Sequence, residues 1–582
     1  MKKFFLVLLV SVALTAAGIG VFIVTFDLNR FKPQITLAVE KAIGSPVKIE
    51  SLKLGWSGGV VFGLNKLAVY AGRQPMDKSI ATLDRANVHL KLGPLLRKKL
   101  EVVSVTLVRP RLNIVKDENG LVRVNGIHPP PGAAQAPKAG PPGRASLVQS
   151  FSVGALRIEN GEIGYLDRTG QGALKRIAVK DLDVTVKNLS FINPVDFEAK
   201  FSLLSSSQNM SLKGRLLVPS PQGPYTLQDF ELKNDLSSIR ISELSDAVPS
   251  MKNSGLVEPI RGVLEVSIGR LAVSSGGLGD LNAALALKGG HFQVRSLRSA
   301  FEGVTLQADI HKNYLNLRKF SAGFAKGTLE AQALSRNYVS AASQTRVGIK
   351  ADRWELEAIL PTPKPGRPQL HGNLSMVFNG DAQGLSWSSI SNTLNGRGRV
   401  ILTNGLVVNL NLLKTVFDRL SKVPGVSDAL NNDLPPGYRE RLSKSYTVLE
   451  PLDFNVDIVN GEFLFPELRI SSMGFQMAGT GRASLAGAVD FQAALFLDPE
   501  LSRILLSSVP NMQYVANSQG LVAIPVRVTG TVQNLSVEPD MDFILQKVLF
   551  EKGQELVGKV LEKALNKTGE TTHKNILGKL LQ

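Results

Sequence analysis

The stretch that decides the fold is Phe475 to Asp498, FQMAGTGRASLAGAVDFQAALFLD. Its apolar side chains recur at every second position on both sides of a small-residue interruption. The residues of this parity are Phe475, Met477, Ala483, Leu485, Val489, Phe491, Ala493, Leu495 and Leu497. A period of two places them on one face of a strand, so we predict two strands with an apolar face. Gly479, Gly481 and Gly487 share the parity and predict bulges or bends.

Strands of the same kind begin at Val47. Val103, Val105 and Leu107 share one face of a later strand, and the residues between them share the other. Pro110 cannot donate a backbone hydrogen bond, so it predicts a sheet edge or a break in the strand at that point.

Asn-Gly dipeptides punctuate the chain seven times, at 119, 125, 160, 379, 395, 404 and 460. Type I′ turns need φ > 0 at both central positions, which Asn and Gly tolerate. Three of these dipeptides lie between apolar runs, so we predict hairpins over 153–167, 400–408 and 456–465. The pattern is typical of tandem antiparallel strands.

Helices are predicted at four places. Gln34 to Ile43 has apolar residues at helical spacing, with Pro33 before it and Gly44 after it. It lies at the membrane exit or caps a β domain. Leu410 to Ser421 and Ser502 to Val509 are shorter candidates. Asp542 to Leu565 carries a broad apolar stripe and either lies on a membrane or covers the end of the β body.

A membrane anchor is predicted at Phe4 to Phe26, FFLVLLVSVALTAAGIGVFIVTF, which has no charged residue. A hydrocarbon core needs about 20 apolar residues in a helix. The alternative is a cleaved signal peptide, because Lys2 and Lys3 precede the run. The apolar region of a signal peptide covers about 7–15 residues, and this run continues beyond that, which favours an anchor. We expect an N-terminus inside and a body outside.

Composition restricts the possible functions. Cysteine is absent, which excludes disulfides, thiolate metal sites, a catalytic thiol and acylation at a cysteine. The net charge of +18 favours anionic surfaces such as phospholipid headgroups. The basic residues are scattered and form no nucleic-acid-binding motif, so we expect no nucleic-acid partner.

The sequence contains no constellation that predicts catalysis. No two of the six histidines share a metal-ligand spacing, and there is no nucleophile-elbow motif. We therefore predict no catalytic, cofactor-binding or metal-binding residues, no cofactor and no enzymatic activity.

Many strands with one apolar face must bury that face against something. One solution is a set of stacked β-sandwiches with closed cores. The other is an open, curved sheet whose apolar face binds acyl chains, because burial of apolar surface contributes about 25 cal/mol per Å². The pattern alone permits both.

The chain resembles the AsmA family of Gram-negative envelope proteins along nearly its whole length. The resemblance is carried by the anchor followed by Asp27 to Lys32, by Gly44 to Ile49, by Arg109-Pro110-Arg111, by Ile158 to Gly161, by Leu394 to Gly396, by Thr403 to Gly405, and by Ile524 to Val532 with Glu538-Pro539-Asp540. The sequence departs from the family at Gly44-Ser45-Pro46, where Thr-Gly-Arg is more usual, and in a Pro-rich insert.

This resemblance implies a mainly β protein, in which a transmembrane helix precedes a long antiparallel, curved β-sheet groove with a few capping or amphipathic helices, similar to bridge-like lipid transfer proteins of the TamB and chorein type. It implies an anchor in the inner membrane, an N-terminus in the cytoplasm and a periplasmic body that handles phospholipid and supports outer-membrane homeostasis. We expect the acyl chains to lie along Val103, Val105, Leu107, Phe491, Ala493, Leu495 and Leu497.

The predicted organisation has five parts. They are the anchor at 1–26, a membrane-proximal β region at 27–127, a Pro/Gly/Ala-rich linker at 128–146, a central groove region at 147–380 and a C-terminal region at 381–582. A rival function is an assembly factor or scaffold for outer-membrane proteins, which would offer strand edges to other envelope proteins. Strand richness supports both functions equally.

Overall fold

The computed structural model describes residues 27–57, 59–70, 79–96, 101–116, 122–124, 152–167, 175–190, 193–217, 223–247, 255–274, 277–295, 297–340, 343–360, 365–384, 386–484, 487–531 and 534–547. The predicted anchor and linker lie outside these residues. Within them, no helix is both long and apolar enough to cross a membrane. The chain divides into two compact units: unit 1 is Met1–Ser296 with Ala300–Ala322, and unit 2 is Leu297–Ser299 with Gly323–Gln582. The predicted boundary after residue 380 falls inside a strand, and the predicted domain division stays a prediction.

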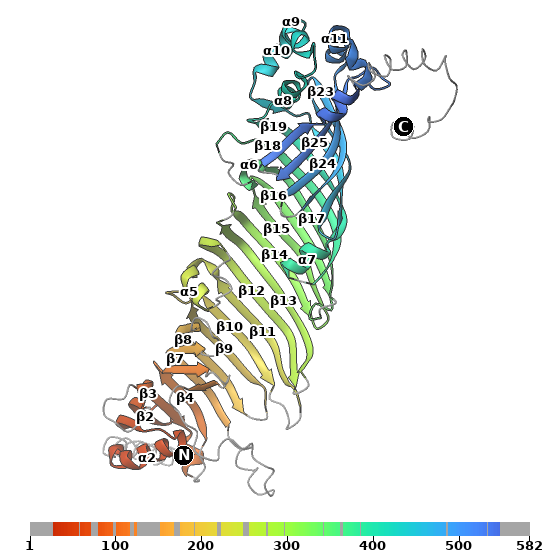
Figure 1. The fold of residues 1–582 in the computed structure, drawn as a ribbon. Coiled ribbons are helices and arrows are strands. Elements are labelled where there is room, and N and C mark those ends of the chain that lie inside the picture. Colours follow the sequence, from red (N-terminus) through yellow and green to blue (C-terminus); the bar gives the residue numbers. More distant parts are fainter. Residues whose placement is uncertain are drawn as a thin grey trace, which may run out of the picture. The chain divides into compact units, whose positions relative to one another are not determined.

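Unit 1 is built on a curved mixed sheet (Figure 1). Its strands are β1 (Val47–Trp56), β2 (Val60–Tyr70), β3 (Ser79–Leu90), β4 (Val102–Val108), β5 (Arg111–Lys116), β6 (Val122–Val124), β7 (Ser152–Asp167), β8 (Lys175–Ser190), β9 (Val195–Leu203), β10 (Met210–Leu217), β11 (Tyr225–Asp235), β12 (Leu256–Ser274), β13 (Gly277–Val294), β14 (Phe301–His311) and β15 (Tyr314–Phe324), the last of which reaches the boundary of the unit. From β7 to β14 each strand pairs antiparallel with the next.

The prediction of a purely antiparallel sheet is wrong at one place. Strand β7 pairs in parallel with both β4 and β5. These two short strands follow one another between β3 and β7, and the break between them falls at Pro110, as predicted. A parallel pairing needs a crossover of about a dozen residues or more, and residues 125–151 supply that length between β6 and β7.

The predicted hairpin at Asn160-Gly161 is also wrong, because β7 runs straight through it. Asn160 has φ 54°, and the pairing with β8 shifts register around Gly161. The bulge lies opposite the β4–β5 break, where the Arg109 N–H donates to the Glu159 carbonyl at 2.7 Å and the Glu162 N–H donates to the Pro110 carbonyl at 2.8 Å. The dipeptide therefore accommodates a neighbouring proline instead of turning the chain.

The sheet is also curved in unit 2 (Figure 1). Its strands are β16 (Gly327–Arg336), β17 (Gln344–Glu355), β18 (Gln369–Gln383), β19 (Asn395–Val408), β20 (Tyr446–Val448), β21 (Leu452–Val459), β22 (Glu462–Ser472), β23 (Phe475–Ser484), β24 (Ala488–Leu497), β25 (Ala523–Thr531) and β26 (Asn534–Pro539). The strand pairings from β16 to β26 are antiparallel, and β19 pairs with both β20 and β21. The strand pair predicted over 475–498 is confirmed as β23 and β24.

Two other hairpin predictions have opposite outcomes. Asn460 and Gly461 have φ values of 50° and 79° and connect β21 to β22, so that hairpin is confirmed. Asn404 lies inside the continuous strand β19, so the predicted turn there is wrong. Its φ of 54° falls where the β18–β19 pairing shifts register between His371 and Asn373. The dipeptide again forms an irregularity within a strand.

Helices are few. They are η1 (Leu28–Phe31), α2 (Lys32–Ile43), α3 (Leu92–Leu96), η2 (Leu236–Ser238) and α5 (Ile241–Ala247) in unit 1, and α6 (Leu356–Ile359), α7 (Trp387–Thr393), α8 (Leu412–Leu420), α9 (Val426–Asn432), α10 (Pro436–Ser443), α11 (Pro499–Ser508) and η4 (Pro510–Val515) in unit 2. The helices predicted at 34–43, 410–421 and 502–509 are confirmed as α2, α8 and α11. The last predicted helix is seen over 541–547, and its remainder lies outside the described residues.

Helix α2 covers the beginning of the unit 1 sheet, as the capping alternative predicted. It ends at Gly44, which has φ 75°, and its inner side chains Ile35, Val39 and Ile43 pack against a buried cluster of β1–β3. The Glu40 carboxylate accepts the Val47 N–H at 2.9 Å. The helix is thereby fixed to the first strand of the sheet.

The largest closed core lies in unit 2. Helices α8, α9 and α11 pack their apolar faces onto one end of β23–β25 and bury Val416, Leu420, Leu501, Met512 and Ile524 almost completely. The sheet residues at this end are therefore covered by protein.

Candidate functional site

A continuous row of apolar residues crosses the sheet of unit 1, with one residue on each of the strands β1–β4 and β7–β14. Paired residues on neighbouring strands point to the same face of a sheet. The row, which we call strip 1, comprises Leu52, Leu64, Ala86, Leu107, Ile158, Val184, Ala199, Leu212, Leu232, Val266, Leu285 and Ala308. It starts beneath α2, since Leu52 and Leu64 belong to the cluster on which that helix packs.

Beyond α2, the larger side chains of strip 1 are only partly buried within the described residues, although Ala199 and Ala308 are buried. Leu107, Leu212, Leu232 and Val266 are all half-buried and belong to none of the buried clusters. The buried leucines of the unit 2 core, by contrast, are 0–7% exposed. The larger residues of strip 1 therefore form an apolar surface that the described residues cover only in part.

Unit 2 carries a second row on its apolar face. This row, strip 2, comprises Leu329, Ala351, Met376, Val400, Phe454, Phe465, Gly481, Phe491, Val528 and Val537. The ring centroids of Phe454 and Phe465 are 5.8 Å apart, and those of Phe465 and Phe491 are 5.0 Å apart. These rings are half-buried, so strip 2 presents aromatic surface.

The structure separates the predicted site residues into two groups. Val105 and Leu107 lie half-buried at strip 1, and Phe491 and Ala493 lie half-buried at strip 2. Val103, which is 42% exposed, sits where the β3–β4 pairing shifts register. Leu495 and Leu497 are 1% and 0% exposed and belong to the helix-covered core. Protein side chains therefore already cover Leu495 and Leu497.

Most of strip 1 went unpredicted, although a signal exists. Leu212, Leu232 and Val266 each lie in a segment that alternates apolar and polar residues, like the one around Leu107. Alternation identifies a face within one strand, but only the register between strands shows that the faces join.

The predicted bulges at Gly479 and Gly481 need correction. The β23–β24 pairing is regular over both glycines, and the register shift lies on the other side, in β22 between Phe465 and Leu468. A Cβ on Gly481 would lie 2.5 Å from the Phe491 ring, so this glycine leaves room for an aromatic side chain. Gly487, with φ 87°, is in the turn between the strands, as predicted.

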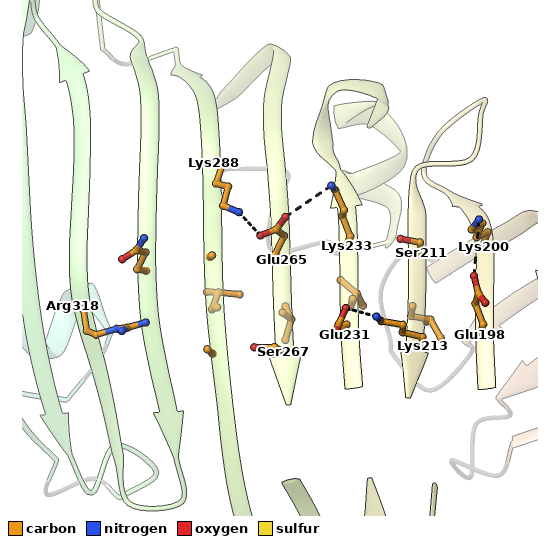
Figure 2. A pocket seen from close by; sticks show the side chains of 17 residues that line it. Glu198, Lys200, Ser211, Lys213, Glu231, Lys233, Glu265, Ser267, Lys288 and Arg318 are labelled. Carbon is orange, nitrogen blue, oxygen red and sulfur yellow. Dashed lines mark hydrogen bonds and ion pairs between the residues drawn. The ribbon is translucent and has the colours of Figure 1, made fainter. Parts of the chain in front are cut away.

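The opposite face of the unit 1 sheet is charged. A shallow hollow of about 730 Å³ lies there over β9–β15. Figure 2 shows Lys233 and Lys288 both directed at Glu265, and Lys213 directed at Glu231. The closest contacts are 2.7 Å for Lys288–Glu265 and 2.8 Å for Lys213–Glu231. The hydrogen bond from Lys288 holds the pKa of Glu265 below its ordinary value.

These ion pairs do not make the hollow a strong ligand site. The lysines are well exposed, so water and salt screen each pair and it contributes little to stability. Their charges are largely balanced by neighbouring carboxylates. The charged face therefore keeps one side of the sheet in water, and the apolar strips on the other side are the candidate functional surface.

Tyr438 connects α10 to the base of α11 in the unit 2 core. Its hydroxyl donates to Asp498 Oδ2 at 2.6 Å, while Asp498 Oδ1 accepts the Leu501 N–H at 2.8 Å and caps the helix. Desolvation, reinforced by the hydrogen bond to Asp498, raises the pKa of Tyr438 well above its ordinary value. The neutral phenol is thus the form that the fold stabilises.

Tyr438→Phe should lower the free energy of unfolding by about 1.5–3 kcal/mol, because a hydrogen bond to a charged group is lost. The contribution of Tyr438 is fully present below the ordinary tyrosine pKa of about 10 and is lost as pH rises above it, because the unfolded chain ionises first. Chemical denaturation between pH 8 and 11 measures both effects. An equal alkaline decline in the wild type and the variant would contradict this role.

The described residues contain no group of three or more His, Asp or Glu side chains that could hold a metal ion. What the fold and the strips define is a β-sheet protein with an apolar face of several strands left uncovered. Residues 1–260 match the model of the AsmA family, which confirms the predicted resemblance over this part of the chain. No curated protein and no solved structure matches the chain significantly. The family match suggests envelope lipid transport or outer-membrane assembly.

Proposed function

We propose that strips 1 and 2 bind the acyl chains of phospholipids, and that the protein assists phospholipid transport between the inner and outer membranes and so supports outer-membrane homeostasis. The observation that carries this proposal is strip 1. It is apolar on each of the twelve strands that it crosses between β1 and β14, yet Leu107, Leu212 and Leu232 are only half-buried among the described residues.

An acyl chain is a suitable cover for such a surface. Burial of each methylene contributes about 0.8 kcal/mol, so a chain of ordinary length offsets the exposure of several leucines. The opposite, charged face would stay in water, and phospholipid headgroups would lie at the margin of the strips. Leu495 and Leu497 are left out of the binding surface because helices already cover them.

The proposal also includes the placement of the protein. We propose that Phe4 to Phe26 spans the inner membrane once, with the N-terminus in the cytoplasm and the body in the periplasm. Helix α2 begins at Lys32, soon after this segment, and covers the first strands of strip 1. Lipid would then enter strip 1 beside α2.

Photo-crosslinking in native membranes tests the proposal. A crosslinking amino acid at Leu212 or Leu232 should capture phospholipid through its acyl chains. The same probe at Lys213 or Glu231, one residue away on the charged face, should not. Equal capture on both faces, or no lipid at either, would contradict the proposal. Capture of outer-membrane proteins alone would favour the assembly-factor function.

A further inference from the structure

Each unit contains the same arrangement of two phenylalanines around a glycine on three neighbouring strands. In unit 1, Gly214 of β10 lies between Phe197 of β9 and Phe230 of β11. In unit 2, Gly481 of β23 lies between Phe465 of β22 and Phe491 of β24. We call these arrangements the Phe–Gly–Phe triplets.

The rings of each triplet meet over the glycine. The centroids of Phe197 and Phe230 are 6.4 Å apart with an angle of 43° between the rings, and those of Phe465 and Phe491 are 5.0 Å apart with an angle of 45°. A Cβ on Gly214 would lie 2.9 Å from Phe197 Cζ and 3.2 Å from Phe230 Cδ2. The rings therefore occupy the space that a side chain on the central strand would need.

Both triplets lie on the apolar face. Phe197 is two residues from Ala199 of strip 1 on β9, and Phe230 is two residues from Leu232 of strip 1 on β11, so they share its face. Gly481 and its two phenylalanines belong to strip 2 itself. All four rings are half-buried. At these points the uncovered surface is formed by aromatic rings laid across a strand.

We propose that the two triplets make the strips selective for unbranched acyl chains, an inference that rests on the proposed function. Rings that lean over a glycine replace the separate, flexible side chains found elsewhere along the strips with a rigid surface. A straight chain can keep continuous contact with such a surface. A chain with methyl branches is held away from it and loses contact, because rigid rings cannot move aside.

The test compares lipid loading of the full-length protein from vesicles of palmitoyl-oleoyl phosphatidylcholine and of diphytanoyl phosphatidylcholine, whose chains carry methyl branches. Bound lipid is measured by mass spectrometry. The wild type should bind about ten times more of the unbranched lipid than of the branched lipid. The Phe197→Leu and Phe491→Leu double variant should lose most of this preference while still loading lipid.

A glycine variant gives a second readout. Gly214→Ala should push both rings away from β10 and reduce loading of the unbranched lipid, and Gly214→Ala combined with Phe197→Leu should restore it. Gly93→Ala is the control, because a Cβ there meets no atom within 4 Å. Should Gly214→Ala fail to fold, the phenylalanine double variant still decides the question.

The two proposals fail in different ways. If the wild type loads neither lipid, the proposed function is wrong. If it loads both equally, or if the phenylalanine double variant keeps the full preference, acyl-chain binding stands and the role of the triplets is overturned.

Discussion

Leu107→Arg should reduce the phospholipid bound to the full-length protein by about tenfold, because an acyl chain cannot cover a charge without a large desolvation cost. Leu107 is the fourth residue of strip 1, paired with Ala86 on one side and Ile158 on the other. Quantitative mass spectrometry of lipid extracted from the purified protein measures the effect.

Thr106→Arg is the matched control. Thr106 is the preceding residue of the same strand and points to the charged face, where it pairs with Asn87 and Arg157. The added charge there stays in water, so lipid loading should match that of the wild type. If both variants load lipid normally, the strip is not the binding surface. If both variants lose lipid, the arginine disturbs strand β4 itself, and the loss does not show which face binds lipid.

Leu497→Ala should produce the largest loss of stability, about 2–5 kcal/mol, because it leaves a cavity in a closed core. Leu497 is 0% exposed and packs beneath the helices of unit 2, although it shares a parity with Phe491 along β24. Chemical denaturation of the full chain in detergent measures the change.

Val448→Ala provides the comparison for this core variant. Val448 is 51% exposed, so its truncation should change the free energy of unfolding by no more than about 0.5 kcal/mol. A small effect at Leu497 would mean that the helices do not cover this end of the sheet in solution. The residue would then return to the lipid-binding surface that the sequence pattern assigned to it.

Leu107 and Leu497 show how far the sequence could predict the site. Period-two alternation correctly identified the apolar face at Val105, Leu107 and Phe491. It could not identify what covers that face, because cover comes from elements distant in sequence. Leu497 and Leu107 look alike in their own strands, but α8 and α11 cover the former.

The turns show a similar limit. Asn460-Gly461 forms the hairpin that its sequence predicts, while Asn160-Gly161 forms a bulge in a continuous strand. Both asparagines have positive φ, so the local preference was predicted correctly. Asn160 differs because it lies opposite Pro110, where strand β4 ends and β5 begins. Pro110 is far from Asn160 in the sequence, so this neighbour is known only once the strand pairing is known.

The glycines of the two Phe–Gly–Phe triplets show the same limit of sequence-based prediction. Gly481 was predicted to mark a bulge, since a glycine in a strand commonly does. In the structure it makes room for the Phe491 ring, and Gly214 does the same for Phe197. A cross-strand contact of this kind depends on register and could not be derived from either strand alone.

The proposed function requires that the apolar strips bind acyl chains. The most direct measurement is native mass spectrometry of the full-length protein released from its own membranes, followed by identification of the bound lipids. We expect more than one phospholipid per chain, and about tenfold less for Leu107→Arg than for Thr106→Arg. A wild-type protein that carries no phospholipid, or equal amounts on both variants, would contradict it.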